Sequence, residues 1–216
     1  MLIAGIDEAG RGPCLGPLTL GIALIEKNNE EKLIELKVRD SKELTAYQRN
    51  SIYSKLNEAL KNFSFLNVSA EELYSLMLRK SLNEIEAIKI AELINSLNEK
   101  PEVIFVDSPD PIQENFAVRI KKYLGFKVKI IAEHKADSTY PIVSAASIIA
   151  KVQRDKAINE LKKEFGEIGS GYSHDEVTIK YLKEFIKQNN ALPFFARKKW
   201  ETTQRLMNEK FQQKLL

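Results

Sequence analysis

Residues 2–8 read Leu2-Ile3-Ala4-Gly5-Ile6-Asp7-Glu8, an apolar run that ends in two carboxylates. A short apolar run bounded by charged residues is typical of a strand buried inside a sheet. A second apolar run, Leu18 to Ile25, follows after a connection that is rich in glycine and proline. The two runs predict a long hairpin, with Asp7 and Glu8 at the end of its first strand.

The chain beyond this hairpin alternates between helical and strand-like patterns. Apolar residues at helical spacing predict helices over residues 45–60, 69–78, 81–97 and 142–165, with Thr45 and Ser69 as N-caps of the first two. Short apolar runs predict strands over 103–106 and 128–131. This alternation indicates an α/β core, which we place at residues 1–168. Residues 169–216 carry no strand pattern and predict a helical C-terminal appendage.

Composition narrows the class of protein. The 216 residues are 44% hydrophobic and 29% charged, as in a soluble globular protein. The longest apolar run, Pro141 to Ala150, is far shorter than the ~20 residues of a membrane span, and residues 1–8 lack the features of a secretory signal. We therefore expect a cytoplasmic protein. Cys14 is the only cysteine, which excludes an intramolecular disulfide and a cysteine zinc site.

The charge is only mildly basic. A net charge of +3 permits a nucleic-acid partner and fits many other proteins equally well. One cationic cluster, Arg197-Lys198-Lys199, precedes the single tryptophan, Trp200. Such clusters are usually solvated, so a surface position is the default expectation for all three cations.

Carboxylates end more than one predicted strand. Asp107 follows the strand at 103–106, and Asp137 lies between the strand at 128–131 and the long helix at 142–165. Sites in α/β sheets form at the carboxyl ends of strands, so Asp7, Glu8, Asp107 and Asp137 are candidates for one cluster. Clustered carboxylates repel unless cations share the site, and oxygen ligands favour Mg²⁺ or Mn²⁺ over zinc. For each acid alone, a turn or helix-capping role remains the alternative.

The tripeptide Gly10-Arg11-Gly12 directly follows the first two acids. Two glycines let the backbone approach a ligand closely, and the arginine is suited to a phosphate. A simple tight turn is the other reading.

These residues belong to segments that together resemble the ribonuclease HII family, the type 2 ribonucleases H. The segments are Gly5 to Pro13 with Gly16-Pro17, Asp40-Ser41-Lys42-Glu43-Leu44, Val106-Asp107, His134-Lys135-Ala136-Asp137, Ser144 to Asp155, and Gly169-Ser170-Gly171-Tyr172. They occur in the family's order and span most of the chain. The form of the fourth segment, and the ending Arg197, Trp200, Thr202, resemble the archaeal branch.

The resemblance implies a fold and a reaction. The fold is a ribonuclease H-like core, with a mixed β-sheet flanked by helices, and a helical C-terminal region that helps to hold the substrate. The reaction is cleavage of the RNA strand of RNA·DNA hybrids and incision 5′ of single ribonucleotides in duplex DNA, leaving 3′-hydroxyl and 5′-phosphate ends. Two Mg²⁺ or Mn²⁺ ions, held by Asp7, Glu8, Asp107 and Asp137, bridge the scissile phosphate.

The resemblance also assigns substrate contacts. Gly10, Arg11 and Gly12 match the loop that reads the 2′-hydroxyl and the adjacent phosphate. Lys42 matches a lysine near a substrate phosphate, and Tyr172 matches the tyrosine that stacks at the RNA–DNA junction. The Ser173-His174 pair departs from the family pattern, in which proline or a small residue is expected. Four residues share one face of the long helix and either touch the substrate backbone or pack the helix: Ser144, Ser147, Lys151 and Arg154.

Two other functions stay open at the level of sequence. A resolvase-like or transposase-like nuclease also uses clustered acids and two metals, and an accessory, non-catalytic subunit would bind nucleic acid alone. The first does not need the Gly-Arg-Gly loop or Tyr172, and the second would lack one or more of the four acids. We expect a monomer whose partners are RNA·DNA hybrids and ribonucleotide-containing duplexes. The segment Phe211 to Leu216 leaves docking to a sliding clamp possible.

Overall fold

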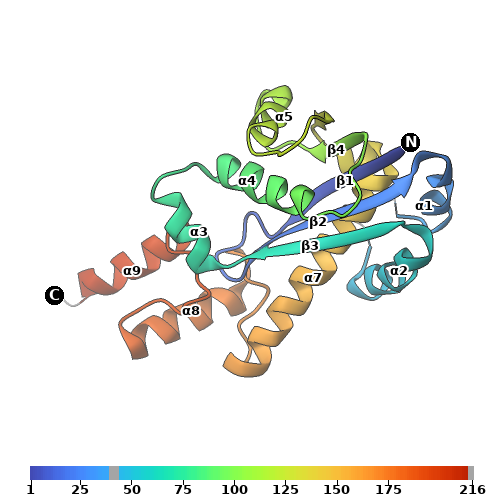
Figure 1. Cartoon of the computed structure of the whole chain (residues 1–216). Coiled ribbons are helices and arrows are strands. Elements are labelled where there is room, and N and C mark those ends of the chain that lie inside the picture. Colours follow the sequence, from blue (N-terminus) through green and yellow to red (C-terminus); the bar gives the residue numbers. More distant parts are fainter. Residues whose placement is uncertain (39–43, 214–216) are drawn as a thin grey trace. The chain divides into compact units, whose positions relative to one another are not determined.

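The computed structural model describes residues 1–38 and 44–213, side chains of 211–213 excepted (Figure 1). The chain divides into two compact units. Unit 1 comprises Met1–Ala9, Thr19–Leu66 and Ser81–Gln153, and unit 2 comprises Gly10–Leu18, Asn67–Lys80 and Arg154–Leu216. This division differs from the expected one at residue 168, because two earlier stretches join the C-terminal helices and the long helix α7 (Pro141–Phe165) contributes to both units.

Unit 1 is built around a five-stranded sheet with the order β3-β2-β1-β4-β5. The strands are β1 (Leu2–Ala9), β2 (Leu18–Glu26), β3 (Asn62–Val68), β4 (Val103–Asp107) and β5 (Lys129–Glu133). The predicted hairpin of β1 and β2 is antiparallel, whereas β1 pairs with β4 and β4 with β5 in parallel. The expected mixed sheet is therefore confirmed.

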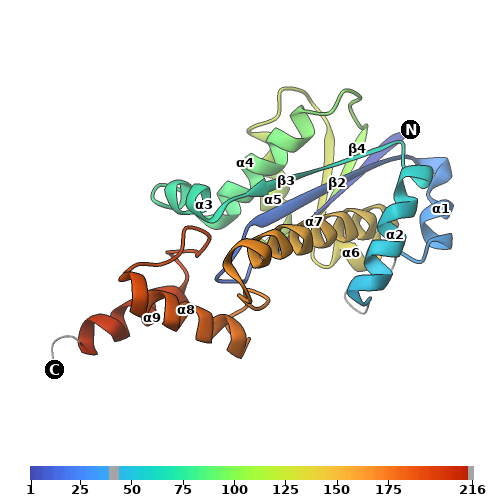
Figure 2. The same cartoon turned by 90° about the horizontal axis from the view of Figure 1, so that it is seen from below.

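Helices cover both faces of this sheet (Figure 2). Successive strand residues point to opposite faces. One face packs against α4 (Leu82–Asn95) and α5 (Gln113–Lys121), through residues such as Ala4, Ile6, Ile104 and Val106. The other packs against α7, α1 (Glu31–Glu35) and α2 (Ala46–Ala59), through residues such as Ile3, Ile25, Val103 and Phe105.

Helix α7 lies directly on the centre of the sheet. A Cβ added at Gly5 would collide with the backbone of Ile142 and Val143, so only glycine permits this approach. The helix buries Val143, Ala146 and Ile149 against β1 and β2. This close packing decides which α7 side chains reach the end of β1.

Most predicted helices are present with their expected starts. Thr45 and Gln48 form a capping box at α2, and the Ser69 hydroxyl accepts a hydrogen bond from the Glu72 N–H at α3 (Ala70–Met77). The structure adds elements that the pattern did not predict: β3, α1, α5, the 3₁₀ turn Lys27–Asn29 and α6 (Ala136–Thr139).

Unit 2 is helical apart from its loops and the short end of β3, as expected for the C-terminal region. Its helices include α8 (Glu176–Asn189) and α9 (Glu201–Gln213), and its core gathers Cys14, Leu15, Ile168, Leu182, Ile186 and Phe195. An isolated bridge joins Leu15 to Ala196. The loop that begins at Gly10 is thereby part of the same core as the C-terminal helices.

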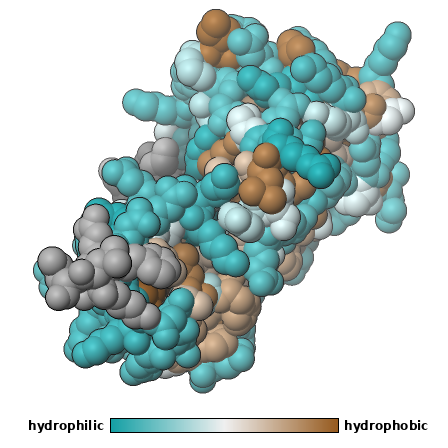
Figure 3. Space-filling view, turned by 90° about the vertical axis from the view of Figure 1, so that its left-hand side faces the viewer, coloured by the Kyte–Doolittle hydropathy of each residue, from teal (hydrophilic) through white to brown (hydrophobic). Residues whose placement is uncertain are grey.

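The space-filling view shows one face of the molecule (Figure 3). Hydrophilic side chains predominate on the face in Figure 3, and hydrophobic ones appear there in separate areas. Scattered apolar residues of this kind are normal on such surfaces. Within residues 1–38 and 44–213, no helix combines the length and the apolar character that a membrane span requires.

Candidate functional site

Two of the predicted acids lie on neighbouring parallel strands. Ile6 of β1 pairs with Val106 of β4, and the next residue on each strand is Asp7 and Asp107. Strand alternation turns both carboxylates to the face that α7 covers, the face that also holds Ile3 and Phe105. The predicted convergence of these two acids is therefore found in the structure.

Two side chains of α7 meet Asp7. The Ser147 hydroxyl hydrogen-bonds the Asp7 carboxylate, and the Lys151 ammonium attracts it electrostatically. Lys151 in turn donates a hydrogen bond to the Ser147 hydroxyl. Ser147 is completely buried, which favours support of Asp7 over direct contact with a substrate.

The surroundings of Asp7 disfavour the ionised form of its carboxylate. Only 6% of the residue is exposed, and burial together with the charge of Asp107 raises the pKa of Asp7 to about 6, although Lys151, Ser147 and the Glu8 N–H act in the opposite direction. The Glu8 N–H donates to Oδ1 of Asp7 at 2.8 Å. A cation bound nearby would favour the ionised carboxylate and so offset this effect.

Asp137 comes to the same end of the sheet. Asp107 pairs with Glu133, the last residue of β5, and the Ala136 N–H donates to Oδ1 of Asp107 at 2.8 Å. Lys135, with φ of 57°, turns the chain there into α6, which begins with Ala136 and Asp137. The buried Ser144 hydroxyl of α7 donates to the Asp137 carbonyl, so this serine also supports an acid-bearing segment.

Glu8 differs from the other three acids. It pairs with Leu20, whose side chain packs on the α4 face of the sheet, so Glu8 points to the face opposite Asp7. Among the described residues, no three carboxylate, imidazole or thiol groups already form a metal cluster. The donors nearest to one are Asp7 and Asp107, and their oxygen chemistry fits Mg²⁺ or Mn²⁺.

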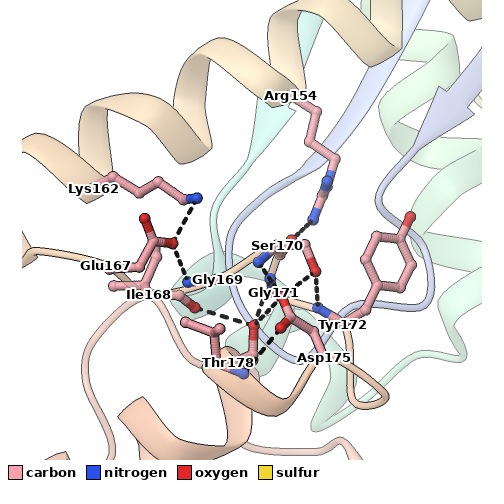
Figure 4. Close-up of polar contacts among 11 residues, drawn as sticks. Arg154, Lys162, Glu167, Ile168, Gly169, Ser170, Gly171, Tyr172, Asp175 and Thr178 are labelled. Atoms are coloured by element: carbon pink, nitrogen blue, oxygen red, sulfur yellow. Dashed lines mark hydrogen bonds and ion pairs between the residues drawn. The ribbon is translucent and has the colours of Figure 1, made fainter. Parts of the chain in front are cut away.

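In unit 2, a dense set of hydrogen bonds holds the loop before Tyr172 (Figure 4). Asp175 accepts from the N–H and the hydroxyl of Ser170, both at 2.6 Å, and from the Val177 N–H at 3.0 Å. These hydrogen bonds lower the pKa of Asp175 to about 2. The Gly171 N–H donates to the Thr178 hydroxyl at 2.9 Å. The loop is thereby attached to the first turn of α8, which limits the positions open to Tyr172.

Arg154, also in unit 2, is buried beside this loop rather than extended into solvent. It is 6% exposed, donates to the Ser170 carbonyl at 3.0 Å, and lies 5.2 Å from the centre of the Tyr172 ring. Burial lowers the pKa of its guanidinium. Its Nε has no hydrogen-bond partner in the described part of the chain. These contacts favour Arg154 as a support for Tyr172.

The unexpected His174 packs next to Tyr172. The two rings lie 5.3 Å apart between centres and are tilted by 35°. A hollow of about 490 Å³ beside them is lined by Ser173, His174, Glu176, Ile179, Lys180, Lys183 and Glu184. The departure from the family pattern therefore adds a second ring beside the predicted junction tyrosine.

The remaining predicted residues are placed as follows. Gly12 is exposed and Arg11 partly exposed, whereas Gly10 is buried with φ of 81°, a backbone conformation that favours glycine. Lys42 lies outside the described residues. Cys14 is buried, and its thiol donates to the Gly171 carbonyl at 3.3 Å.

Sequence reasoning missed Arg197. The cationic run was expected to be solvated, but Arg197 is 1% exposed and is the largest fully buried side chain of the described residues. Lys198 and Lys199 are exposed, as expected. A run of three adjacent cations gave no signal that would separate the buried one from its neighbours.

Comparison with known proteins shows similarity over nearly the whole chain. The family model described as Ribonuclease HII matches residues 4–203. The ribonuclease HII of Pyrococcus horikoshii is 46% identical over 100% of this chain and 97% of its own length. The crystal structure of ribonuclease H2 from Pyrococcus horikoshii OT3 matches with a TM-score of 0.92 at 46% identity, covering 98% of this chain and 99% of that one.

A second solved structure is that of the PCNA:RNase HII complex from Archaeoglobus fulgidus. It matches with a TM-score of 0.85 at 40% identity, over 93% of this chain and 96% of that one. The family model and these relatives cover nearly the whole chain. The chain belongs to the ribonuclease HII family and is an endoribonuclease that acts on RNA·DNA hybrids.

Proposed function

We propose that this chain cuts by a two-metal mechanism and also incises duplex DNA 5′ of a single ribonucleotide. The observation that carries the metal part is the Asp7–Asp107 pair, side by side at the ends of β1 and β4. The raised pKa of Asp7 supports it, because a divalent cation would remove the cost of holding this carboxylate ionised.

Asp7, Asp107 and Asp137 are the proposed ligands on the α7 face of the sheet, with Glu8 as the fourth. When bound, two Mg²⁺ or Mn²⁺ ions supply activation of the attacking water and stabilisation of the leaving 3′ oxygen. Ser147 and Lys151 orient Asp7, and the Ala136 N–H orients Asp107. The products are a 3′-hydroxyl and a 5′-phosphate.

Substrate choice is assigned to unit 2. The backbone at Gly10, Arg11 and Gly12 recognises the 2′-hydroxyl, the group that distinguishes a ribonucleotide from its DNA neighbours. The Tyr172 ring stacks on the following sugar, where a deoxyribose permits close contact. The hydrogen bonds between the Ser170 loop and Asp175 support this role, because they hold the backbone on which Tyr172 stands.

A calorimetric titration tests the metal site. Mg²⁺ and Mn²⁺ are titrated into the wild-type chain and into the variants Asp7→Asn, Glu8→Gln, Asp107→Asn and Asp137→Asn. We expect the three aspartate variants to lose most of the binding heat and Glu8→Gln to lose less, because Glu8 lies on the opposite face of the sheet. Undiminished binding in Asp7→Asn and Asp107→Asn would rule out this site.

The parallel assay is cleavage of a continuous RNA·DNA hybrid with and without divalent metal. Cleavage in EDTA equal to that in Mg²⁺ would exclude the two-metal mechanism. An all-DNA junction in the same assay separates this function from a resolvase-like nuclease, which would cut the junction.

We also propose that the chain docks to a sliding clamp. The support is the similarity to the Archaeoglobus fulgidus protein, whose structure is that of a complex with PCNA. The candidate segment is Phe211 to Leu216, of which residues 214–216 lie outside the described part. A pull-down with an archaeal clamp, comparing wild type with Phe211→Ala and Leu215→Ala, is expected to show retention of wild type only. If the clamp retained the variants as well as wild type, Phe211 to Leu216 would not be the docking segment.

A further inference from the structure

One buried side chain contacts most of the proposed 2′-hydroxyl-reading loop. Arg197 donates to three backbone carbonyls: from Nη2 to Gly10 at 2.5 Å, from Nη1 to Arg11 at 3.0 Å and from Nε to Gly16 at 3.0 Å. All of these residues belong to unit 2. A planar guanidinium has donors in fixed directions, so it holds three carbonyls in one arrangement.

Trp200 completes this set of contacts. Its indole N–H donates to the Gly12 carbonyl at 3.2 Å, and its ring lies 4.8 Å from the Arg197 guanidinium carbon. The Arg197 N–H donates to the Cys14 carbonyl at 2.9 Å. We call Arg197 and Trp200 together the brace. It binds the carbonyls of the three loop residues Gly10, Arg11 and Gly12, and those of Cys14 and Gly16 that follow the loop.

The brace itself is fixed from the other side. The Thr203 hydroxyl lies 2.6 Å from the Arg197 carbonyl oxygen and 2.8 Å from the Trp200 carbonyl oxygen and shares its one proton between them. Thr203 is fully buried at the start of α9. The loop position is therefore tied to a helix and not only to flexible side chains.

The direction of the carbonyls determines that of the neighbouring N–H groups. In a planar trans peptide, the carbonyl of one residue and the N–H of the next point in opposite directions, and the described residues contain no cis peptide bond. Because the carbonyls of Gly10 and Arg11 point at Arg197, the N–H groups of Arg11 and Gly12 point away from it. Two adjacent donors directed the same way suit an oxygen acceptor such as a 2′-hydroxyl or a phosphate.

We infer that Arg197 and Trp200 are positioning residues for substrate recognition, which hold the Arg11 and Gly12 N–H groups toward the ribonucleotide. The inference rests on the proposed role of the Gly10–Gly12 loop. It gives the buried Arg197 a function, which is to act on the substrate indirectly, through the position of the loop.

The test uses two variants and a matched control. Trp200→Phe keeps an aromatic ring beside Arg197 and removes only the donor to Gly12. Arg197→Lys keeps the charge but cannot donate to three separated carbonyls from one nitrogen. The control is Arg205→Met, which removes one cation from an exposed ion pair with Glu209 in the same unit.

Steady-state kinetics on a continuous RNA·DNA hybrid in Mg²⁺ separate positioning from folding. We expect Trp200→Phe to lower kcat about fivefold, the effect of one lost hydrogen bond, with KM and the thermal unfolding temperature unchanged. Arg197→Lys is expected to lower kcat on the order of 50-fold, for more than one lost hydrogen bond. Arg205→Met should match wild type. Hydrogen–deuterium exchange should quicken in peptides covering residues 10–16 of Trp200→Phe, and not elsewhere.

Two results would overturn the inference. One is an unchanged kcat with unchanged exchange at residues 10–16 in both brace variants. The other is a fall in kcat that accompanies a lower unfolding temperature and a higher KM in both, which indicates a structural role alone. If wild type cuts the hybrid but not a duplex with one ribonucleotide, the proposed single-ribonucleotide activity fails, while the hybrid kinetics still decide on the brace.

Discussion

Asp7 and Asp107 stand side by side because each lies one residue beyond a matched pair, Ile6 and Val106, in a parallel ladder. Adjacent strands are ~4.8 Å apart, so two carboxylates in this register repel each other unless a cation or a proton intervenes. Lys151 supplies part of the compensation. Because Asp7 and Asp107 repel each other, this pair should both bind a metal ion and, without the metal, lower the stability of the folded chain when both carboxylates are ionised.

Asp107→Asn should separate activity from stability. We expect at least a ~100-fold loss of hybrid cleavage, since even the outer partners of metal ligands are worth ~10–100-fold. In EDTA the variant should be no less stable than wild type, because it removes repulsion and its amide oxygen still accepts from the Ala136 N–H. The measurements are cleavage rates and urea unfolding. Near-normal cleavage would remove Asp107 from the site, and a loss of stability in EDTA would indicate a structural role.

The raised pKa of Asp7 predicts how stability depends on pH in EDTA. The pKa of Asp7 is about 6 in the folded state, against an ordinary value of 3.8. Ionising Asp7 therefore lowers the free energy of unfolding, and this loss is complete above the folded-state pKa. It is relieved as the pH falls from 7 toward 4. Asp7→Asn carries no such cost and should exceed wild type by up to about 3 kcal/mol in unfolding free energy at pH 7.5, and by little at pH 4. Urea unfolding at both pH values measures the difference, and a difference independent of pH would contradict the prediction.

Asp175 makes the opposite pH prediction in unit 2. Hydrogen bonds from Ser170 hold its pKa at about 2, below the ordinary 3.8, so its contribution is complete above pH 4 and is lost as the pH falls toward 2. Because Asp175 also caps α8, Asp175→Ala should cost about 1–2 kcal/mol at pH 7. It should also lower cleavage at a single ribonucleotide, since Tyr172 loses its support. Gln188→Ala, at an exposed position in the last turn of α8, is the control and should change neither property.

Lys198 and Lys199 test the electrostatic part of substrate binding. Both are exposed, and Lys198 lies 5.2 Å from the centre of the Tyr74 ring. Replacing both by alanine should weaken binding of all duplexes alike and flatten the slope of log Kd against log salt by about 2, one per lost phosphate contact. Lys32→Ala with Lys55→Ala, two exposed lysines of unit 1, provides the control. An unchanged slope would show that Lys198 and Lys199 are solvated and do not contact the duplex.

The pattern of apolar residues predicted the centre of the fold better than its edges. Strands β1, β4 and β5 are short apolar runs between charged residues, and periodicity identifies them directly. Strand β3 is an edge strand in which only Val68 is fully buried, and α5 is short, so neither shows a strong apolar pattern. The grouping of Gly10–Leu18 with the C-terminal helices arises from contacts between distant segments, which local pattern does not reveal.

The local strand pattern also predicted the acids of the site, but it did not predict which side chains surround them. Asp7 and Asp107 lie in the last residues of β1 and β4, Asp137 follows β5 after a short connection, and strand order brings the three acids to one end of the sheet. The helical spacing of Ser147 and Lys151 showed a shared face, but only the packing of α7 at Gly5 shows that this face meets Asp7. The sequence does not reveal the burial of Arg197, because that burial depends on the carbonyls of Gly10, Arg11 and Gly16, which lie far away in the sequence.

The most direct measurement is incision of a DNA duplex that carries one ribonucleotide, with the cut position and end groups determined in Mg²⁺ and in EDTA. We expect a single cut on the 5′ side of the ribonucleotide in Mg²⁺, with 3′-hydroxyl and 5′-phosphate ends, and none in EDTA or with Asp107→Asn. Tyr172→Ala should slow this cut far more than cleavage of a continuous hybrid. Cleavage by wild type of the continuous hybrid alone, or incision that persists in EDTA, would contradict the account.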